Sequence, residues 1–364
     1  MPRISAAVCH AFGEPLSIEE VELAAPASGE VEVEMGAVAI CHSDLSFIEG
    51  GWGGTLPAVY GHEAAGTITA IGPNVKEFAV GERVAVTLIR SCDACVNCAS
   101  GHPALCTTQH DADSGPLSTA DGGLLHQGMA CGAFAEKVVV KQSQIVKLHA
   151  DIAFEAACLL SCGVVTGIGA VVNSARLRPG EDVVVIGAGG VGLNVIQGAF
   201  LAGARRIVAV DLEEDKLHGA REFGATDTVL ATDDAPWEEA QALLGRKADA
   251  VFVAVGVSSV YDTATHYIGR GGRMVMVGLP HSDSPSTYEP SMVASDGQSL
   301  IGSKMGDVVL RRDIPWMMDL YEQNRLKLNE LVSKRWRLDQ INEAIASTKA
   351  GHARRNVIVF GSGF

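Results

Sequence analysis

Four of the nine cysteines are clustered in one short segment, with the spacing Cys92-x2-Cys95-x2-Cys98-x7-Cys106. Four thiolates spaced in this way can close a tetrahedral zinc site that keeps no open position for a substrate. An iron–sulfur cluster is the other metal group that four thiolates hold. The polar loop offers no electron-transfer partner, so we favour a structural zinc, whose binding energy orders the loop.

A second metal site is suggested by three residues that lie far apart in the sequence, Cys41, His62 and Cys162. Two thiolates and one imidazole form a ligand set of catalytic zinc, which leaves its fourth position open. Taken singly, each residue is better explained as a buried cysteine or a hydrogen-bonded histidine. The prediction therefore depends on whether the rest of the chain supplies a reaction for an open zinc position.

A dinucleotide-binding pattern supplies that reaction. The β-branched run 182–186 is followed by Gly187-Ala188-Gly189-Gly190-Val191-Gly192, the helical stretch 193–202 and the apolar run 207–210, which ends in Asp211. Strand, G-x-G-x-x-G, helix, strand and acid in this order form the dinucleotide fingerprint. Gly187 permits the tight turn, Gly189 lets the backbone approach a pyrophosphate, and Gly192 lets the helix pack on the strand.

Asp211 indicates which dinucleotide binds. It lies about 20 residues beyond the glycine loop, where an acid accepts hydrogen bonds from the ribose hydroxyls of NAD. A carboxylate there repels the 2′-phosphate of NADP, and Leu212, Glu213 and Glu214 offer no arginine to hold one. The sequence therefore predicts NAD.

The positioning elements divide the chain into two regions. Strand patterns occur at residues 18–23, 31–35, 66–71, 83–89 and 134–140, and residues 45–60 are predicted to be a Gly-rich loop with only local order. After residue 150, helices are predicted at 154–160, 167–177 and 313–324, and strands at 227–230, 248–255 and 273–277, with further helices between those strands. The C-terminal stretch 354–360, which ends in an apolar strand, is well placed to pair back with the first region.

These patterns predict a two-domain α/β protein. One domain is β-rich and comprises residues 1–163 and 305–364, and the other is a doubly wound parallel sheet at residues 164–304. A chain of 364 residues exceeds what one core usually supports. His102, His110 and His126 have irregular spacing, so we expect them to be solvated loop residues rather than a third metal site.

Composition excludes several partners. The formal net charge of −15 argues against nucleic acid and against an anionic membrane surface. The N-terminal residues do not form a signal peptide, and no apolar run approaches the roughly 20 residues of a membrane span. We therefore expect a soluble, cytoplasmic protein that acts on a small molecule.

Taken together, the motifs resemble the zinc-containing medium-chain alcohol dehydrogenases over nearly the whole chain. The matching pieces are Cys41-His42-Ser43-Asp44, Gly61-His62-Glu63, the four-cysteine lobe, Ser161-Cys162-Gly163, the glycine loop with Asp211 and the terminal strand. The resemblance implies a GroES-like catalytic domain with a Rossmann domain. Features of the dimeric liver-type branch (107–131) occur beside those of bacterial aryl-alcohol relatives (304–315, 326–328), so we expect a homodimer or homotetramer.

The resemblance also implies residue roles. Cys41, His62 and Cys162 would hold the catalytic zinc, and Cys92, Cys95, Cys98 and Cys106 the structural zinc, which makes two zinc ions per chain. Ser43 would take the proton of the alcohol, with His42 and Glu63 as further active-site residues, Asp44 fixing the tautomer of His62 and Leu88 walling the substrate pocket. The cofactor would contact Gly187, Gly189, Gly190, Val191, Gly192, Asp211, Lys216, Thr166 and, through its pyrophosphate, Arg355.

Two positions depart from the family pattern. His42 stands where liver-type members have an arginine that holds the pyrophosphate, so we expect a looser, pH-sensitive grip on NAD. Ser46 stands where many members have the histidine that ends the proton relay, so the relay must end differently.

The expected activity is the reversible, zinc-dependent oxidation of primary aliphatic or aromatic alcohols to aldehydes, with hydride transfer to NAD in a cleft between the domains. A thiol-dependent formaldehyde dehydrogenase is an alternative within the family, but it needs cationic residues for the carboxylates of glutathione, and none can be placed. A non-catalytic NAD-binding protein is a third reading. The presence of Ser43 with all three zinc ligands argues against it.

Overall fold

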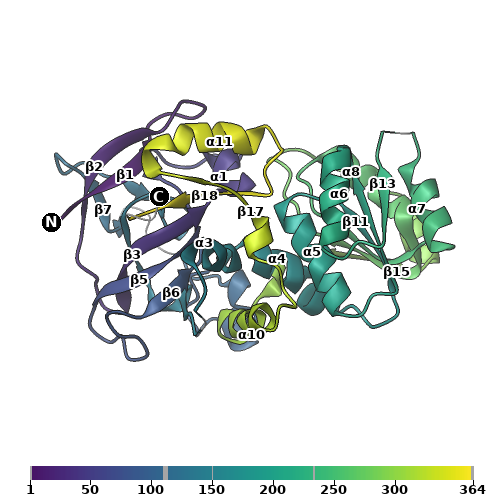
Figure 1. The fold of residues 1–364 in the computed structure, drawn as a ribbon, viewed down its shortest axis with the longest axis horizontal. Coiled ribbons are helices and arrows are strands. Elements are labelled where there is room, and N and C mark those ends of the chain that lie inside the picture. The colour runs from purple at the N-terminus through teal and green to yellow at the C-terminus, as the bar shows by residue number, and fades with distance from the viewer. Residues whose placement is uncertain (1, 110–113, 150, 233, 362–364) are drawn as a thin grey trace. The chain divides into compact units, whose positions relative to one another are not determined.

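The computed structural model describes residues 2–109, 114–149, 151–232 and 234–361 (Figure 1). The chain forms two units, Met1–Cys162 with Val309–Phe364 and Gly163–Val308. The second break falls after Val308, a few residues beyond the predicted one, because the turn Met305–Asp307 packs against helix α4 (Gly163–Gly169). His110 lies outside the described residues.

The first unit contains two sheets. In the smaller one the strand order is β7-β2-β1-β4-β8, formed by Leu117–Thr119, Ser17–Leu23, Arg3–Cys9, Ala58–Val59 and His126–Gln127. His126 is buried in strand β8, so the prediction that it is a solvated loop residue is wrong. Its pairing with Ala58 of β4 brings it into the sheet.

In the larger sheet the order is β10-β6-β5-β3-β18-β17, formed by Ile145–Lys147, Arg83–Val86, Glu63–Ile71, Glu30–Ala39, Arg355–Val359 and Val332–Trp336. Strand β9 (Lys137–Lys141) also pairs with β3. The C-terminal strand β18 pairs antiparallel with β3, which confirms the predicted return of the chain end to the first region (Figure 1).

The helices of this unit are α1 to α3, α10 and α11, at His42–Ile48, Val96–Ala99, Phe154–Ala157, Leu310–Glu322 and Ile341–Lys349. Helix α1 corrects the prediction of a loop from residue 45. Its buried Leu45 and Ile48 pack on the core, and the Asp44 carboxylate accepts a hydrogen bond from the Cys41 backbone N–H, which caps the first turn. The Gly-rich loop begins only at Gly50, where φ is +79°.

The second unit is a parallel sheet of order β13-β12-β11-β14-β15-β16, formed by Asp227–Leu230, Arg206–Asp211, Asp182–Ile186, Ala248–Val253, Ile268–Met276 and Ser299–Gly302. Its further helices are α5 to α9, at Gly190–Leu201, Glu214–Glu222, Pro236–Leu244, Ser258–Ala264 and Pro290–Ser295. This is the strand order of a dinucleotide-binding sheet. The two-domain α/β fold class is thereby confirmed.

Among the described residues, no single helix is long and apolar enough to cross a membrane; a bent pair, Phe154–Ser161 with Gly163–Ala175, passes that test only in combination.

Replacement of Gly61 by alanine should lower the free energy of unfolding of the first unit. Gly61 has a φ of +93°, and an added Cβ would lie 2.6 Å from the Phe134 backbone nitrogen. Gly81 is the matched control, since its φ is +91° and nothing lies within 4 Å of its Cβ position. We expect Gly81→Ala to cost about 1–2 kcal/mol for the left-handed backbone alone, and Gly61→Ala to cost about 2 kcal/mol more. Urea unfolding measures both, and equal costs would contradict the contact.

Candidate active site

Cys41, His62 and Cys162 converge in the first unit. Their ligand atoms all lie within 4.8 Å of one another, and the Nε2 atom of His62 is 3.3 Å from the Sγ atom of Cys162. Cys41 immediately precedes α1, His62 immediately precedes β5, and Cys162 follows the 3-10 helix η5 (Cys158–Ser161). All three are buried. Two soft sulfur atoms and one imidazole nitrogen at this spacing fit a zinc ion with three protein ligands.

Asp44 organises two of these three residues. One carboxylate oxygen accepts a hydrogen bond from the Cys41 backbone N–H at 2.9 Å. The other accepts one from the Gly61 backbone N–H at 3.0 Å and lies 3.0 Å from the Nδ1 atom of His62. The carboxylate thereby favours the Nδ1–H tautomer, which leaves Nε2 free to bind metal beside the thiols.

The same contacts shift the proton affinities of the ligands. Burial lowers the pKa of His62, but the Asp44 carboxylate beside it outweighs burial and raises that pKa well above its ordinary value. A hydrogen bond from the Cys162 thiol holds the pKa of Cys41 well below its ordinary value. Metal binding must release protons from His62 and the thiols, so it is opposed at low pH.

Glu63 and Arg355 form a buried ion pair next to the ligands. The Nε atom of Arg355 lies 3.6 Å from a carboxylate oxygen of Glu63, and both side chains are at most 5% exposed. Each residue opens a strand of the larger sheet, β5 and β18 respectively. The guanidinium thus neutralises a carboxylate that would otherwise be strongly destabilised by burial. The pyrophosphate contact of Arg355 stays a prediction.

The residues expected around the substrate lie close by in sequence and fold. His42 is exposed at the first position of α1, while Ser43 and Ser46 are partly exposed one helical turn apart. Leu88 lies two residues beyond Val86, which pairs with Ala64 in the β5–β6 ladder. The ladder ends at this pair, so the place of Leu88 at the substrate pocket stays a prediction.

The four-cysteine lobe also comes together. The ligand atoms of Cys92, Cys95, Cys98 and Cys106 all lie within 4.8 Å of one another. Backbone N–H groups, first that of Cys98 and then that of Thr107, lower the pKa of Cys95 to about 5. Hydrogen bonds of this kind stabilise thiolates, the form that binds metal. Four converging thiolates with no open position fit a structural zinc.

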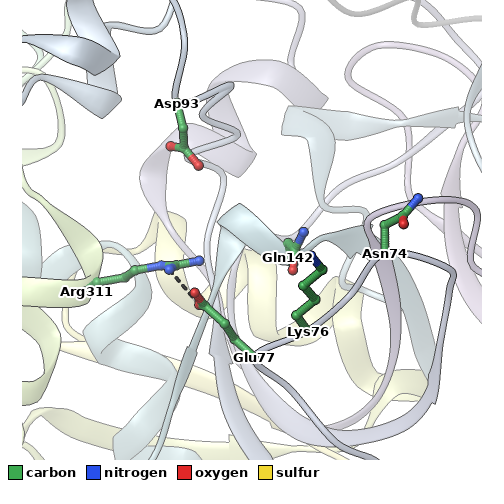
Figure 2. A pocket seen from close by; sticks show the side chains of 6 residues that line it. All are labelled: Asn74, Lys76, Glu77, Asp93, Gln142 and Arg311. Atoms are coloured by element: carbon green, nitrogen blue, oxygen red, sulfur yellow. Dashed lines mark ion pairs between the residues drawn. The ribbon is translucent and has the colours of Figure 1, made fainter.

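Other polar groupings of this unit do not resemble a substrate site. His149, Asp319 and Glu322 are close enough to share a cation, but all three are exposed. A shallow pocket of about 250 Å³ has the polar lining Asn74, Lys76, Glu77, Asp93, Gln142 and Arg311 (Figure 2). Arg311 and Glu77 pair across it at 2.6 Å. Alcohol pockets are mostly apolar, so neither grouping is a candidate for the substrate.

The glycine loop of the second unit has the geometry that its sequence predicts. Gly187 has a φ of +96°, and a Cβ on Gly192 would lie 1.8 Å from the Gly187 carbonyl oxygen, so helix and strand approach too closely for any side chain. Gly189 begins α5 as its N-cap and has nothing within 4 Å of its Cβ position. Open space at a helix N-terminus fits the pyrophosphate of a dinucleotide.

Asp211 holds this loop at the end of β12. One carboxylate oxygen accepts a hydrogen bond from the Ala188 backbone N–H at 2.7 Å, and the other accepts one from the Glu213 N–H at 3.2 Å. Lys216 pairs with Glu213 at 2.8 Å rather than with Asp211. Thr166 on α4 faces the sulfur of Met305 at 3.6 Å. The ribose contact of Lys216 and the cofactor contact of Thr166 therefore stay predictions.

Sequence reasoning missed the pairing of Glu63 with Arg355 and the hydrogen bonds of the buried Gln144 side chain. Arg355 lies on a strand that returns from the far end of the chain, and Gln144 bonds carbonyl groups of two other segments, so no local spacing indicates either set of contacts. The importance of Gly61, in contrast, could have been predicted, because this glycine directly precedes the metal ligand His62.

Comparisons with known proteins agree with this geometry. The family model for the alcohol dehydrogenase GroES-like domain matches residues 27–150, and that for zinc-binding dehydrogenases matches residues 190–323. The chain is 34% identical to the NDMA-dependent alcohol dehydrogenase of Amycolatopsis methanolica, covering 98% of this chain and 99% of the relative. It is 32% identical to the S-(hydroxymethyl)glutathione dehydrogenase of Paracoccus denitrificans, covering 98% and 100%.

Among solved structures, the benzyl alcohol dehydrogenase of Acinetobacter calcoaceticus superposes with a TM-score of 0.93 at 29% identity, covering 99% of this chain and 100% of that one. The chain belongs to the zinc-containing medium-chain alcohol dehydrogenases. It is therefore an oxidoreductase of the zinc alcohol dehydrogenase class.

Replacement of Asp44 by asparagine should weaken zinc binding at Cys41, His62 and Cys162 by about 10- to 100-fold. The amide leaves one of the three donors without an acceptor and no longer fixes the ring of His62. Loss of the carboxylate also lowers the pKa of His62, and this change by itself favours metal binding. A net loss of zinc affinity would therefore show that Asp44 acts by orienting the His62 ring. Release of zinc to a chromogenic chelator measures the effect.

The control for this experiment is Glu49→Gln at the exposed end of α1, which should release zinc as the wild type does. The four-cysteine lobe serves as an internal reference in each protein. Wild-type retention of zinc by Asp44→Asn would show that Asp44 does not position the ligands.

Proposed function

We propose that this enzyme reversibly oxidises primary alcohols, aliphatic or aromatic, to aldehydes and that it uses NAD. The observation that carries the proposal is the buried ligand set Cys41, His62 and Cys162 with Ser43 in the adjoining turn of α1. The names of the relatives support alcohols as substrates, and one solved relative is a benzyl alcohol dehydrogenase. The half-buried Leu88 offers an apolar wall for the carbon chain.

The residues divide the work between them. Cys41, His62 and Cys162 would hold zinc, which when bound acts as a Lewis acid toward the alcohol oxygen. Ser43 receives the proton of the alcohol hydroxyl and passes it toward solvent. Asp44 keeps the His62 ring in place during this exchange, because its two oxygens are tied to the backbone on both sides.

The second unit would supply the hydride acceptor. The open space at Gly189 takes the pyrophosphate of NAD. The Asp211 carboxylate favours the ribose hydroxyls of NAD over the 2′-phosphate of NADP, since like charges repel. We further propose two zinc ions per chain, one in each cluster of cysteine-containing ligands.

A thiol-dependent formaldehyde dehydrogenase is the second candidate. It is favoured by the relative from Paracoccus denitrificans, whose name specifies S-(hydroxymethyl)glutathione. The two activities differ in one requirement, because only the second depends on glutathione when formaldehyde is supplied.

Ser43→Ala should lower kcat for ethanol and benzyl alcohol by about 100-fold or more, the usual contribution of a positioned proton acceptor. Binding of NADH, followed by its fluorescence, should stay within twofold of wild type, because the substitution removes one hydroxyl of the first unit. Ser46→Ala, one turn further along α1, is the control and should retain activity within threefold.

Three results would count against the proposal. Survival of turnover in Ser43→Ala would remove the proton acceptor. Turnover of formaldehyde only in the presence of glutathione, with no turnover of simple alcohols, would favour the second candidate. A zinc content well below two per chain in active protein would remove one of the proposed metal sites.

Asp211→Asn should raise the ratio of kcat/KM for NADP to that for NAD by about 10-fold or more, because it removes a negative charge next to the 2′-phosphate. The asparagine oxygen can still accept the Ala188 hydrogen bond that holds the loop. Glu213→Gln is the matched control, since it neutralises a carboxylate two residues away. Its ratio should change less than threefold, and an equal change in both variants would show a general effect of charge.

A further inference from the structure

Gln144 is a buried side chain whose polar atoms are all used. It lies in the 3-10 helix η4 (Gln142–Gln144) and is 1% exposed. Its amide nitrogen donates to the carbonyl oxygens of Thr87 at 3.0 Å and of Ala130 at 2.9 Å. Its amide oxygen accepts from the Lys141 backbone N–H at 3.1 Å. One side chain thus fixes two segments that are far apart in the sequence.

Each of these segments carries an apolar side chain next to its bonded carbonyl. Leu88 follows Thr87, and Met129 precedes Ala130. Both side chains are half-buried and pack against the core of the first unit. The Gln144 amide therefore sets the distance between the backbone positions that carry Leu88 and Met129.

Both segments also adjoin the residues that lead to His62. The chain after Met129 bonds directly to this stretch, because the backbone N–H of Ala133 donates to the Gly61 carbonyl at 2.9 Å and that of Phe134 to the Tyr60 carbonyl at 2.8 Å. Thr87 directly follows strand β6, which pairs with β5 from Ala64 onward, two residues after His62.

The backbone at Met129 and Ala130 is in an unfavourable conformation that needs outside support. Their φ angles are 50° and 55°, in the left-handed region that residues with a Cβ seldom adopt. Gln144 holds the Ala130 carbonyl, and the Cys131 thiol donates to the Thr87 carbonyl at 3.1 Å. Such strain persists only where the surroundings fix it, and it is concentrated at functional sites.

We propose that Gln144 is a positioning residue that sets the size of alcohol the enzyme accepts, by holding the segments of Leu88 and Met129 at a fixed separation. The inference rests on the proposed function and extends it to a residue that touches neither substrate nor cofactor. Its neighbour Gln142 in the same short helix faces the outer polar pocket instead (Figure 2).

Gln127 provides a matched control. Its amide nitrogen donates to the carbonyl oxygens of Cys131 and Val139, each at 2.9 Å. It therefore supports the same turn as Gln144 but ties it to strand β9 and not to the segment of Thr87. A methionine at either position keeps the length of the side chain and removes the hydrogen bonds of its amide with backbone groups, three at Gln144 and two at Gln127.

The experiment compares kcat and KM for ethanol and benzyl alcohol in the wild type, Gln144→Met and Gln127→Met. In Gln144→Met we expect the ratio of kcat/KM for benzyl alcohol to that for ethanol to change at least fivefold, mainly through KM. The KM for NAD and the zinc content should stay at wild-type values. In Gln127→Met the ratio should stay within twofold, even where the melting temperature falls equally.

A double-mutant comparison tests whether Gln144 changes the preference between the two alcohols through Leu88. If Gln144 acts through Leu88, the change in ratio caused by Gln144→Met should fall below twofold in a Leu88→Ala background. Where Gln144→Met fails to fold, Gln144→Asn replaces it, because its amide is one methylene too short to reach both carbonyls.

The outcomes separate this inference from the proposed function. A ratio within twofold of wild type in the Gln144 variants, or an equal shift in Gln127→Met, overturns the positioning role while alcohol oxidation stands. A wild-type enzyme that oxidises neither alcohol overturns the proposed function and the positioning role together.

Discussion

The buried carboxylate of Asp44 is the interaction on which the rest of the first unit depends. It lies at 0% exposure and accepts hydrogen bonds from the backbone of Cys41 and Gly61 while facing the ring of His62. A buried carboxylate is stable only when such donors replace water. The donors that stabilise the Asp44 carboxylate belong to Cys41, Gly61 and His62. The same contacts therefore hold two metal ligands, Cys41 and His62, close together. The start of α1 and the left-handed turn at Gly61 follow from these contacts.

A second buried carboxylate, Glu63, is balanced by an ion pair. Its partner Arg355 comes from the C-terminal strand. The chain end must therefore pair with the larger sheet before the guanidinium can neutralise the Glu63 carboxylate. Breaking a buried pair is costly, because it leaves one charge without a partner. The pairing of β18 with β3 therefore does more than extend a sheet. It makes the chemistry at the N-terminal ligands conditional on residues near the other end of the chain.

The parts of this arrangement that local spacing encodes could be predicted from the sequence. Cys92 to Cys106, the loop Gly187 to Gly192 and the strand that ends in Asp211 each form a pattern within a short window, and the structure has each pattern in one place. Other features depend on which strands become neighbours. Nothing near Gln144 or Arg355 in the sequence indicates their partners. His126 is buried because β4 lies beside it. Residues 45–48 are helical, although the glycines that follow them suggested a loop.

The residues that could not be predicted are connected by one physical constraint. A turn such as Met129–Ala130, with two left-handed residues that carry side chains, is unstable in isolation and needs hydrogen-bond donors from elsewhere. Local conformational preference cannot provide these donors, so the turn is stable only in the complete fold. Because Gln144 also holds the carbonyl of Thr87, relaxing this turn would move the neighbouring segment as well. The relative position of these two segments thus depends on a hydrogen-bond network, and the packing of their apolar side chains alone does not determine it.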